Sequence, residues 1–79
     1  MTDNFASLDT VDGLIVFDAQ MEVVTRFIRS RTGNWFEWNI AMTFAEPRTR
    51  SEVAYKIRYF MLEGFCPRAY RHADPKAQR

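Results

Sequence analysis

The sequence has few of the residues that disulfide staples, metal sites or covalent catalysis require. It holds one cysteine, Cys66, and one histidine, His72, among 79 residues. A single cysteine excludes an internal disulfide framework and is typical of a reducing compartment. Two candidate ligands are too few for a structural zinc site, which takes about four. A thiolate–imidazole pair needs fixed hydrogen-bond geometry and an orienting third group, and His72 lies near the end of the sequence, so we do not expect this pair to act as a catalytic dyad.

Other absences narrow the class of protein further. No apolar run approaches the roughly 20 residues of a membrane span, and the N-terminal segment lacks the basic and apolar regions of a signal peptide. We therefore expect a cytoplasmic protein that does not enter a membrane. Three glycines leave no GxGxxG or GxxxxGK[ST] phosphate loop, and no EF-hand loop is present. The sequence predicts a protein that is not an enzyme and that carries no metal or cofactor.

Charge is nearly balanced over the whole chain but is unevenly distributed. Residues 1–22 have a net charge of −5 and contain no Lys or Arg, whereas residues 23–79 have a net charge of +6. Nine of the eleven basic residues are Arg, the side chain better suited to planar recognition and to interfaces. The overall net charge of +1 is weaker than a nucleic-acid-binding domain usually has.

What the chain does contain is enough apolar material for one small packed domain. Apolar residues make up 47% of the chain, and aromatic residues make up 15% of the chain. A domain of this size is near the lower limit for folding without disulfides or metal. We expect an acidic lead-in over residues 1–12, a folded core over residues 13–65 and a basic tail over residues 66–79.

The clearest strand pattern covers residues 35–44, where large apolar residues alternate with mostly small or polar ones. Such alternation is typical of a strand with one buried face. The apolar set is Phe36, Trp38, Ile40, Met42 and Phe44. Residues 13–17 form a second short strand. Residues 22–30 fit either a strand or a helix capped by Asp18, and their β-branched content favours the strand.

A hairpin turn within residues 31–34 would join the second strand to the third. With a two-residue turn, at Thr32-Gly33 or Gly33-Asn34, odd positions of the second strand lie opposite even positions of the third. The covered face would then hold Val23, Thr25, Phe27, Phe36, Trp38, Ile40 and Met42.

The helix after these strands has the strongest end signals. Thr49 and Glu52 match a capping box, and Gly64 stands where a left-handed C-cap is needed, with Phe65 placed for the accompanying contact. The main apolar arc of this helix is Val53, Ile57, Phe60 and Met61, which we expect to cover the even-position face of the third strand. The predicted fold is α+β, an antiparallel three-stranded β-meander with one C-terminal amphipathic helix packed on one face, in the order β-β-β-α.

A second apolar stripe, Tyr55, Tyr59 and Leu62, falls on nearly the opposite side of this helix. The tail or the lead-in could fold over it, a partner could bind it, or it could simply be exposed. It could also be the seam of a homodimer. Trp35 is either a core residue or an exposed anchor at the base of the hairpin.

Together these features favour a small non-enzymatic protein-binding module, an inhibitor or regulatory adaptor. Tyr, Trp and Arg are enriched at binding hot spots. Small cytosolic domains of this kind are common among phage and mobile-element proteins that block host machinery, including inhibitors of CRISPR effectors, so an anti-CRISPR-like role is the base-rate expectation. The expected partner-binding residues are Tyr55, Tyr59, Leu62, Arg58, Arg48, Arg50, Trp35 and Arg26. The alternative is a small nucleic-acid-binding domain that uses Arg and stacking aromatics, and a steep salt dependence would identify it.

Overall fold

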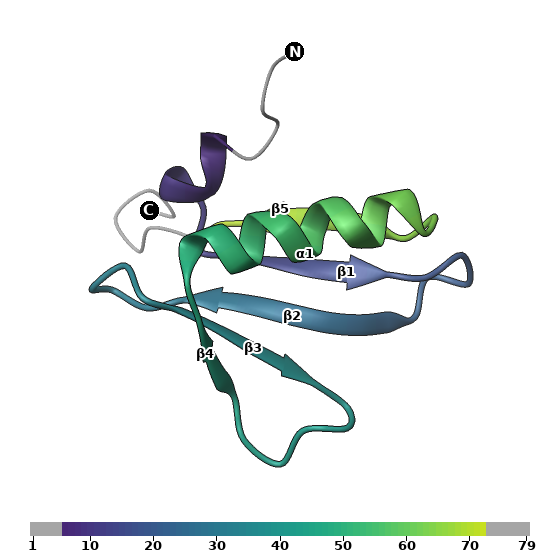
Figure 1. Ribbon diagram of the computed structural model, residues 1–79, viewed down its shortest axis with the longest axis horizontal. Helices are drawn as coiled ribbons and strands as arrows, with labels where there is room; N and C mark the ends of the chain where they lie inside the picture. The colour runs from purple at the N-terminus through teal and green to yellow at the C-terminus, as the bar shows by residue number, and fades with distance from the viewer. Residues whose placement is uncertain (1–5, 73–79) are drawn as a thin grey trace, which may run out of the picture.

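The computed structural model describes residues 6–72, which form one antiparallel sheet, one α-helix and one 3-10 helix (Figure 1). In chain order the elements are η1 (Ala6–Thr10), β1 (Gly13–Phe17), β2 (Val23–Arg29), β3 (Trp35–Asn39), β4 (Glu46–Arg48), α1 (Arg50–Leu62) and β5 (Cys66–Tyr70). The α+β class is confirmed. The sheet has five strands in the order β4-β3-β2-β1-β5, so the predicted three-stranded meander lacks both edge strands. Residues 66–70, expected in a basic tail, form one of these edges.

The turn before β2 explains why residues 23–29 are a strand rather than a helix. The Asp18 carboxylate accepts hydrogen bonds from the backbone N–H groups of Gln20 and Glu22, both at 2.9 Å. An aspartate that satisfies the backbone two residues ahead favours a turn over a helix start. The chain reverses there, with Met21 at a φ of 65°, and β2 returns antiparallel to β1.

The hairpin between β2 and β3 has one residue more than the predicted two-residue turn. The Ser30 N–H donates to the Asn34 carbonyl at 2.8 Å, and the Ser30 carbonyl accepts from the Gly33 N–H at 3.0 Å. Gly33 has a φ of 88°. The loop therefore has three residues and ends at Gly33. The left-handed backbone conformation of this residue is one that only a residue without a Cβ adopts easily.

This extra residue makes the predicted face of β3 wrong, because a shift of one residue moves every side chain to the other side of a sheet. Directly paired residues share a face, and the pairs are Thr25 with Asn39, Phe27 with Glu37, and Arg29 with Trp35. Odd positions of both strands therefore lie on the side of α1. Phe36 and Trp38 lie on the other side of the sheet.

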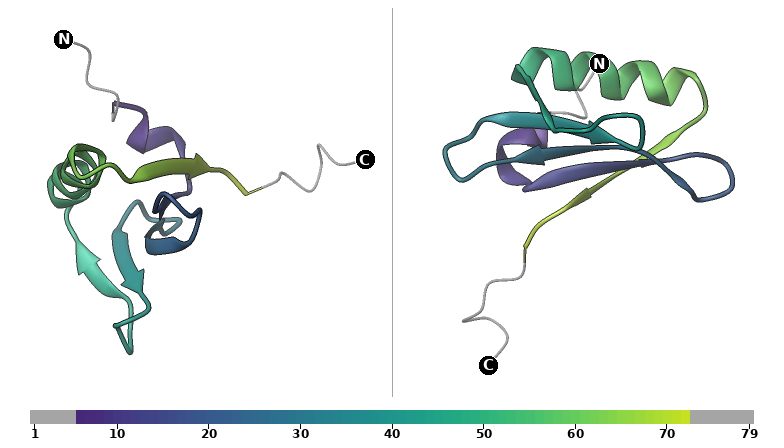
Figure 2. Two further views of the ribbon diagram at one scale, coloured as in Figure 1. Left: turned by 90° about the vertical axis from the view of Figure 1, so that its right-hand side faces the viewer. Right: turned by 90° about the horizontal axis from the view of Figure 1, so that it is seen from below.

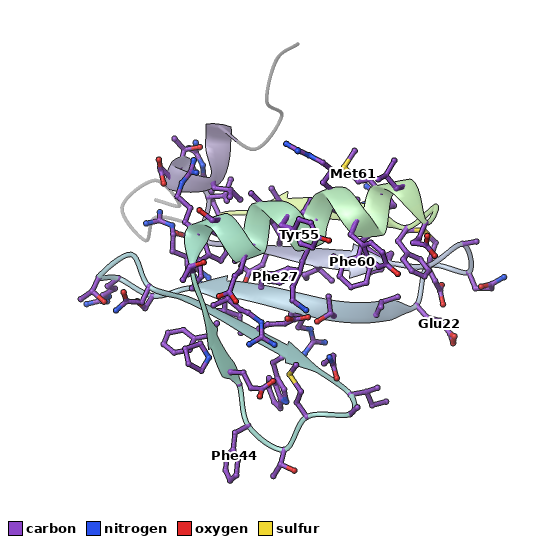
Figure 3. The ribbon with its side chains drawn as sticks, in the orientation of Figure 1. Glu22, Phe27, Phe44, Tyr55, Phe60 and Met61 are labelled. Carbon is purple, nitrogen blue, oxygen red and sulfur yellow. The ribbon has the colours of Figure 1, made fainter. Side chains whose placement is uncertain are left out.

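The third strand is also shorter than predicted. It ends at Asn39, and the chain forms a loop before β4. Two residues expected in the core are exposed in this loop, Ile40 at 99% and Phe44 at 78%. Figure 3 shows Phe44 pointing away from the body of the protein. β4 then pairs antiparallel with β3 over a short length, with Pro47 opposite Phe36.

Both predicted ends of the helix are confirmed. The Thr49 hydroxyl accepts from the Glu52 N–H at 3.0 Å, and the Glu52 carboxylate accepts from the Thr49 N–H at 2.7 Å. At the other end Gly64 has a φ of 93°, and the Phe65 N–H donates to the Phe60 carbonyl at 2.9 Å. The rings of Phe60 and Phe65 are 5.7 Å apart, which supplies the hydrophobic contact of a Schellman cap.

The core lies between α1 and the sheet, with η1 closing one end. Figure 3 shows Phe27 and Phe60 between these layers. The buried apolar residues are Leu8, Val11, Leu14, Val16, Phe27, Trp35, Val53 and Ile57. Val53 and Ile57 confirm the predicted buried arc of the helix, whereas Met61 remains 44% exposed. Leu8 and Val11 belong to the predicted lead-in, so residues outside the expected folded core of 13–65 contribute to packing.

The two edges of the sheet carry prolines. Pro47 lies in β4 and Pro67 in β5, the two strands with one free side. A proline removes a backbone donor and is typical of edges protected against pairing with another chain. Figure 2 shows α1 on one side of the sheet only. The surfaces left for binding are therefore the outer side of α1 and the side of the sheet away from it.

Candidate interaction surfaces

The outer side of α1 presents the second apolar stripe to solvent. Tyr55, Tyr59 and Leu62, which we call the helix stripe, are exposed at 71%, 52% and 81% (Tyr55 is labelled in Figure 3). Neither η1 nor β5 covers it, because Leu8 of η1 is buried in the core and Tyr70 of β5 packs against Gly13. The idea that residues before Ala6 fold over the stripe lies outside the described residues.

Beside the helix stripe the surface is shallowly hollowed, over a volume of about 640 Å³. This hollow is lined by Ser51, Glu52, Tyr55, Lys56, Tyr59 and Phe60. Its lining combines three aromatic rings with one acidic and one basic side chain. Arg58 is exposed on the other flank of the stripe and has no ion pair with another described residue. Four of the eight predicted partner-binding residues, Tyr55, Arg58, Tyr59 and Leu62, therefore lie together on the outer side of α1.

Arg48, another predicted partner-binding residue, instead neutralises a buried carboxylate. Glu37 is only 2% exposed, and its Oε1 lies 2.9 Å from Arg48 Nε and 3.3 Å from Lys56 Nζ. Its other oxygen accepts a hydrogen bond from the Thr25 hydroxyl at 2.9 Å. Glu46 adds a second carboxylate at 3.3 Å from Arg48. This cluster ties β2, β3, β4 and α1 together.

The charge state of Arg48 fits this structural role. Burial lowers the pKa of its guanidinium, but the hydrogen bond and the charge of Glu37, with a smaller contribution from Glu46, raise the pKa above its ordinary value. The guanidinium therefore stays charged wherever the protein is folded. Among the described residues no buried side-chain nitrogen or oxygen lacks a hydrogen-bond partner. A fully paired buried carboxylate is better explained as an internal clamp than as a catalytic acid.

Three more predicted site residues lie elsewhere. Trp35 is 3% exposed, so the core interpretation is confirmed and the exposed-anchor interpretation is wrong. Arg50 donates to the Asp9 carboxylate at 3.0 Å, which joins the start of α1 to η1. Arg26 pairs with Trp38 across the sheet, on the side away from α1. The eight residues therefore form no single site.

The sequence prediction missed the aromatic side chains on the surface where Arg26 lies. We call it the open face, and its strand residues include Ile15, Arg26, Ile28, Phe36, Trp38, Arg68 and Tyr70. Trp38 is 43% exposed, and its indole N–H donates to the Met42 carbonyl at 3.1 Å, which fixes the ring. None of these residues packs on the core, whose partly buried apolar neighbours are Val24, Ala54, Phe60 and Phe65. The length of the loop ending at Gly33 was the signal that could have revealed this face.

The residues that could carry chemistry are not brought together. Cys66 is exposed at the start of β5, and His72 follows its end, with the strand of five residues between them. Over residues 6–72 no group of three or more His, Cys, Asp or Glu side chains could hold a metal ion. In the same part of the chain, no helix has the length and apolar character needed to cross a membrane.

Comparison with protein-family models, with curated proteins and with solved structures finds no match to this chain. Function is therefore inferred from the two exposed surfaces themselves.

Proposed function

We propose that this protein is a small non-enzymatic binding module that docks on another protein through the helix stripe. One observation carries the proposal: three large side chains in line on one helix stay more than half exposed. Exposed contiguous apolar surface rimmed by polar residues is typical of an interaction site. Tyr55 and Tyr59, with Arg58 on the flank, are the residue types that most often supply binding hot spots.

The helix offers this surface in a preorganised form. A capping box, a Schellman cap and the buried residues Val53 and Ile57 fix α1 before any partner arrives. Binding then costs little backbone entropy, because the contact residues already have their final positions. A small, rigid module suits an inhibitor or regulatory adaptor of a cytoplasmic machine, of the kind that mobile elements encode.

A photo-crosslinking experiment tests this proposal directly. A benzophenone amino acid replaces Tyr55 in one variant and Thr32, an exposed residue at the hairpin tip, in a matched control. Both are irradiated in an extract of the cells that express the gene. We expect a discrete adduct from position 55 that is absent from position 32 and that disappears when Leu62→Glu is added.

Two outcomes would contradict the proposal. The first is an absence of position-specific adducts at residue 55. The second is an adduct with twice the mass of the chain, together with a dimer in light scattering at both low and high salt. That second result would assign the helix stripe to a homodimer seam instead.

A further inference from the structure

The open face has a composition different from that of the helix stripe. Across β3, β2, β1 and β5 the register aligns Trp38, Arg26, Ile15 and Arg68 in one row. The next row holds Phe36, Ile28, Gly13 and Tyr70. Three different aromatic side chains and two arginines therefore lie on neighbouring positions of one sheet surface.

The two arginines on this face are available to a ligand. Arg26 and Arg68 flank Ile15, two strand spacings or about 10 Å apart. Both are exposed, and the side chain of neither makes an ion pair or hydrogen bond with another described residue. The acidic side chains within the strands, Glu37 and Glu46, both pair with Arg48 on the side of α1. The strands of the open face therefore present positive charge without a compensating carboxylate.

The ring of Tyr70 lies flat enough on this face to cover Gly13. A Cβ added to Gly13 would collide with the hydroxyl end of the Tyr70 ring, so only a glycine at this position leaves room for the ring. The Trp38 ring is held by its bond to Met42, which leaves part of the indole exposed. Rings held in place with an accessible face are what a stacking platform for unpaired bases requires.

We infer that the open face binds single-stranded nucleic acid, with Trp38 and Tyr70 stacking on bases and Arg26 and Arg68 contacting phosphates. A broad sheet surface of this kind does not enter a duplex groove, and its rings can stack only on unpaired bases. An apolar protein partner would leave two guanidinium groups without counter-charges, whereas a phosphate backbone supplies them. This inference is independent of the proposed protein-binding function, because the helix stripe shares no residue with the open face.

Fluorescence anisotropy of the full chain with labelled oligonucleotides tests the inference. The probes are fluorescein-labelled dT15 and rU15 and a 15-base-pair duplex, in about 50 mM salt. We expect both single strands to bind more tightly than the duplex. Kd for the single strands should rise at least tenfold in Arg26→Glu and in Arg68→Glu. The slope of log Kd against log salt should lose about 0.7 for each phosphate contact removed.

Arg58→Glu is the matched control, since it makes the same change in net charge on the far side of α1. We expect it to change Kd less than twofold. An equal loss in Arg58→Glu and Arg26→Glu would reduce the binding to general electrostatic attraction and overturn the inference. So would tighter binding of the duplex, or no binding of the single strands by the wild type. Far-ultraviolet circular dichroism of each variant identifies any loss caused by unfolding.

Intrinsic fluorescence gives a second readout that a merely structural role would not produce. The other tryptophan, Trp35, is 3% exposed, so only Trp38 can stack on a base. Titration with unlabelled dT15 should quench the emission of the wild type and leave that of Trp38→Phe almost unchanged, while Trp38→Phe still binds. Binding without quenching in the wild type would place the nucleic acid elsewhere and refute the stacking assignment.

Discussion

Removing the Arg48 side chain tests whether the Glu37 cluster acts as an internal clamp. In Arg48→Met the 2% exposed carboxylate of Glu37 keeps Thr25 and Lys56 as partners but loses its most buried cation. Breaking a fully buried pair in this way costs about 3–5 kcal/mol. Arg48 retains 18% exposure and Lys56 remains 3.3 Å away, so the expected loss is smaller, about 2–3 kcal/mol.

Two matched variants bracket this magnitude. Lys56 is 38% exposed, so solvent already screens its charge, and Lys56→Met should cost about 0.2–1 kcal/mol. Arg58→Met makes the same substitution as Arg48→Met at an exposed position without an ion pair among the described residues, and should cost less than about 0.5 kcal/mol. For a domain of this size, the Arg48→Met loss lowers Tm by about 10–20 °C.

The assay is urea unfolding followed by tryptophan emission, because the buried indole of Trp35 reports on the loss of the core. The m-value should stay constant, so that the midpoint alone carries the change in stability. The double variant Glu37→Leu with Arg48→Met removes both charges and should be more stable than Arg48→Met alone by at least about 1 kcal/mol. The clamp interpretation fails if the double variant is no more stable than that single variant, or if Arg48→Met and Arg58→Met have equal effects.

Three shorter predictions follow from the backbone and the helix cap. Gly33→Ala should destabilise the protein by about 1 kcal/mol in urea unfolding, because no atom obstructs the new methyl group and only the left-handed φ opposes it, whereas Gly33→Asn should lose less. The backbone hydrogen bond from Thr49 holds the pKa of Glu52 below its ordinary value of 4.5, so its stabilising effect is present above that pH and is lost as pH falls through the lowered pKa. Tm of the wild type should therefore fall more steeply than Tm of Glu52→Gln when thermal scans are taken to low pH. Gly13→Ala should displace the Tyr70 ring, and a normal single-strand affinity in that variant would show that Tyr70 does not stack.

The parts of the fold that the sequence predicted correctly depend on short-range chemistry. The capping box joins Thr49 to Glu52, the Schellman cap joins Phe60 to Phe65, and the Asp18 turn spans four residues. Each uses groups that are close in the chain, so the local pattern specifies the geometry. The buried arc of α1 was predictable for the same reason, since helical periodicity alone places Val53 and Ile57 together.

The missed elements depend on contacts distant in the sequence. β5 contains a proline and only one large apolar residue, Tyr70, so no local pattern marks it as a strand. It forms because β1 offers a free edge and the Schellman cap directs the chain back along it. Residues 46–48 are likewise a strand only because β3 lies beside them. Such edges depend on the rest of the sheet being in place.

The positions of the predicted partner-binding residues show the same difference between local and long-range determinants. Tyr55, Arg58, Tyr59 and Leu62 lie near one another because one helix carries them all. Trp35 is buried and Arg48 pairs with Glu37 because the faces of both depend on the register of β3, which the loop ending at Gly33 sets. The signal was present in the sequence, since a glycine at the third loop position fits a three-residue hairpin as well as a two-residue turn.

The large apolar residues of 36–44 therefore lie outside the buried core, with Phe36 and Trp38 on the open face and Ile40 and Phe44 in the loop before β4. The observed register buries the Glu37 carboxylate, which costs desolvation free energy, and leaves Phe36 and Trp38 on the open face. Packing alone would favour the opposite register, with the larger side chains under α1. The chain instead supplies Arg48, Lys56 and Thr25 to neutralise and bond the buried carboxylate, a combination that has no use in the alternative register. The chain therefore stabilises the less apolar core and keeps ordered aromatic side chains outside it. Stability alone does not require this arrangement, whereas a binding function of the open face does.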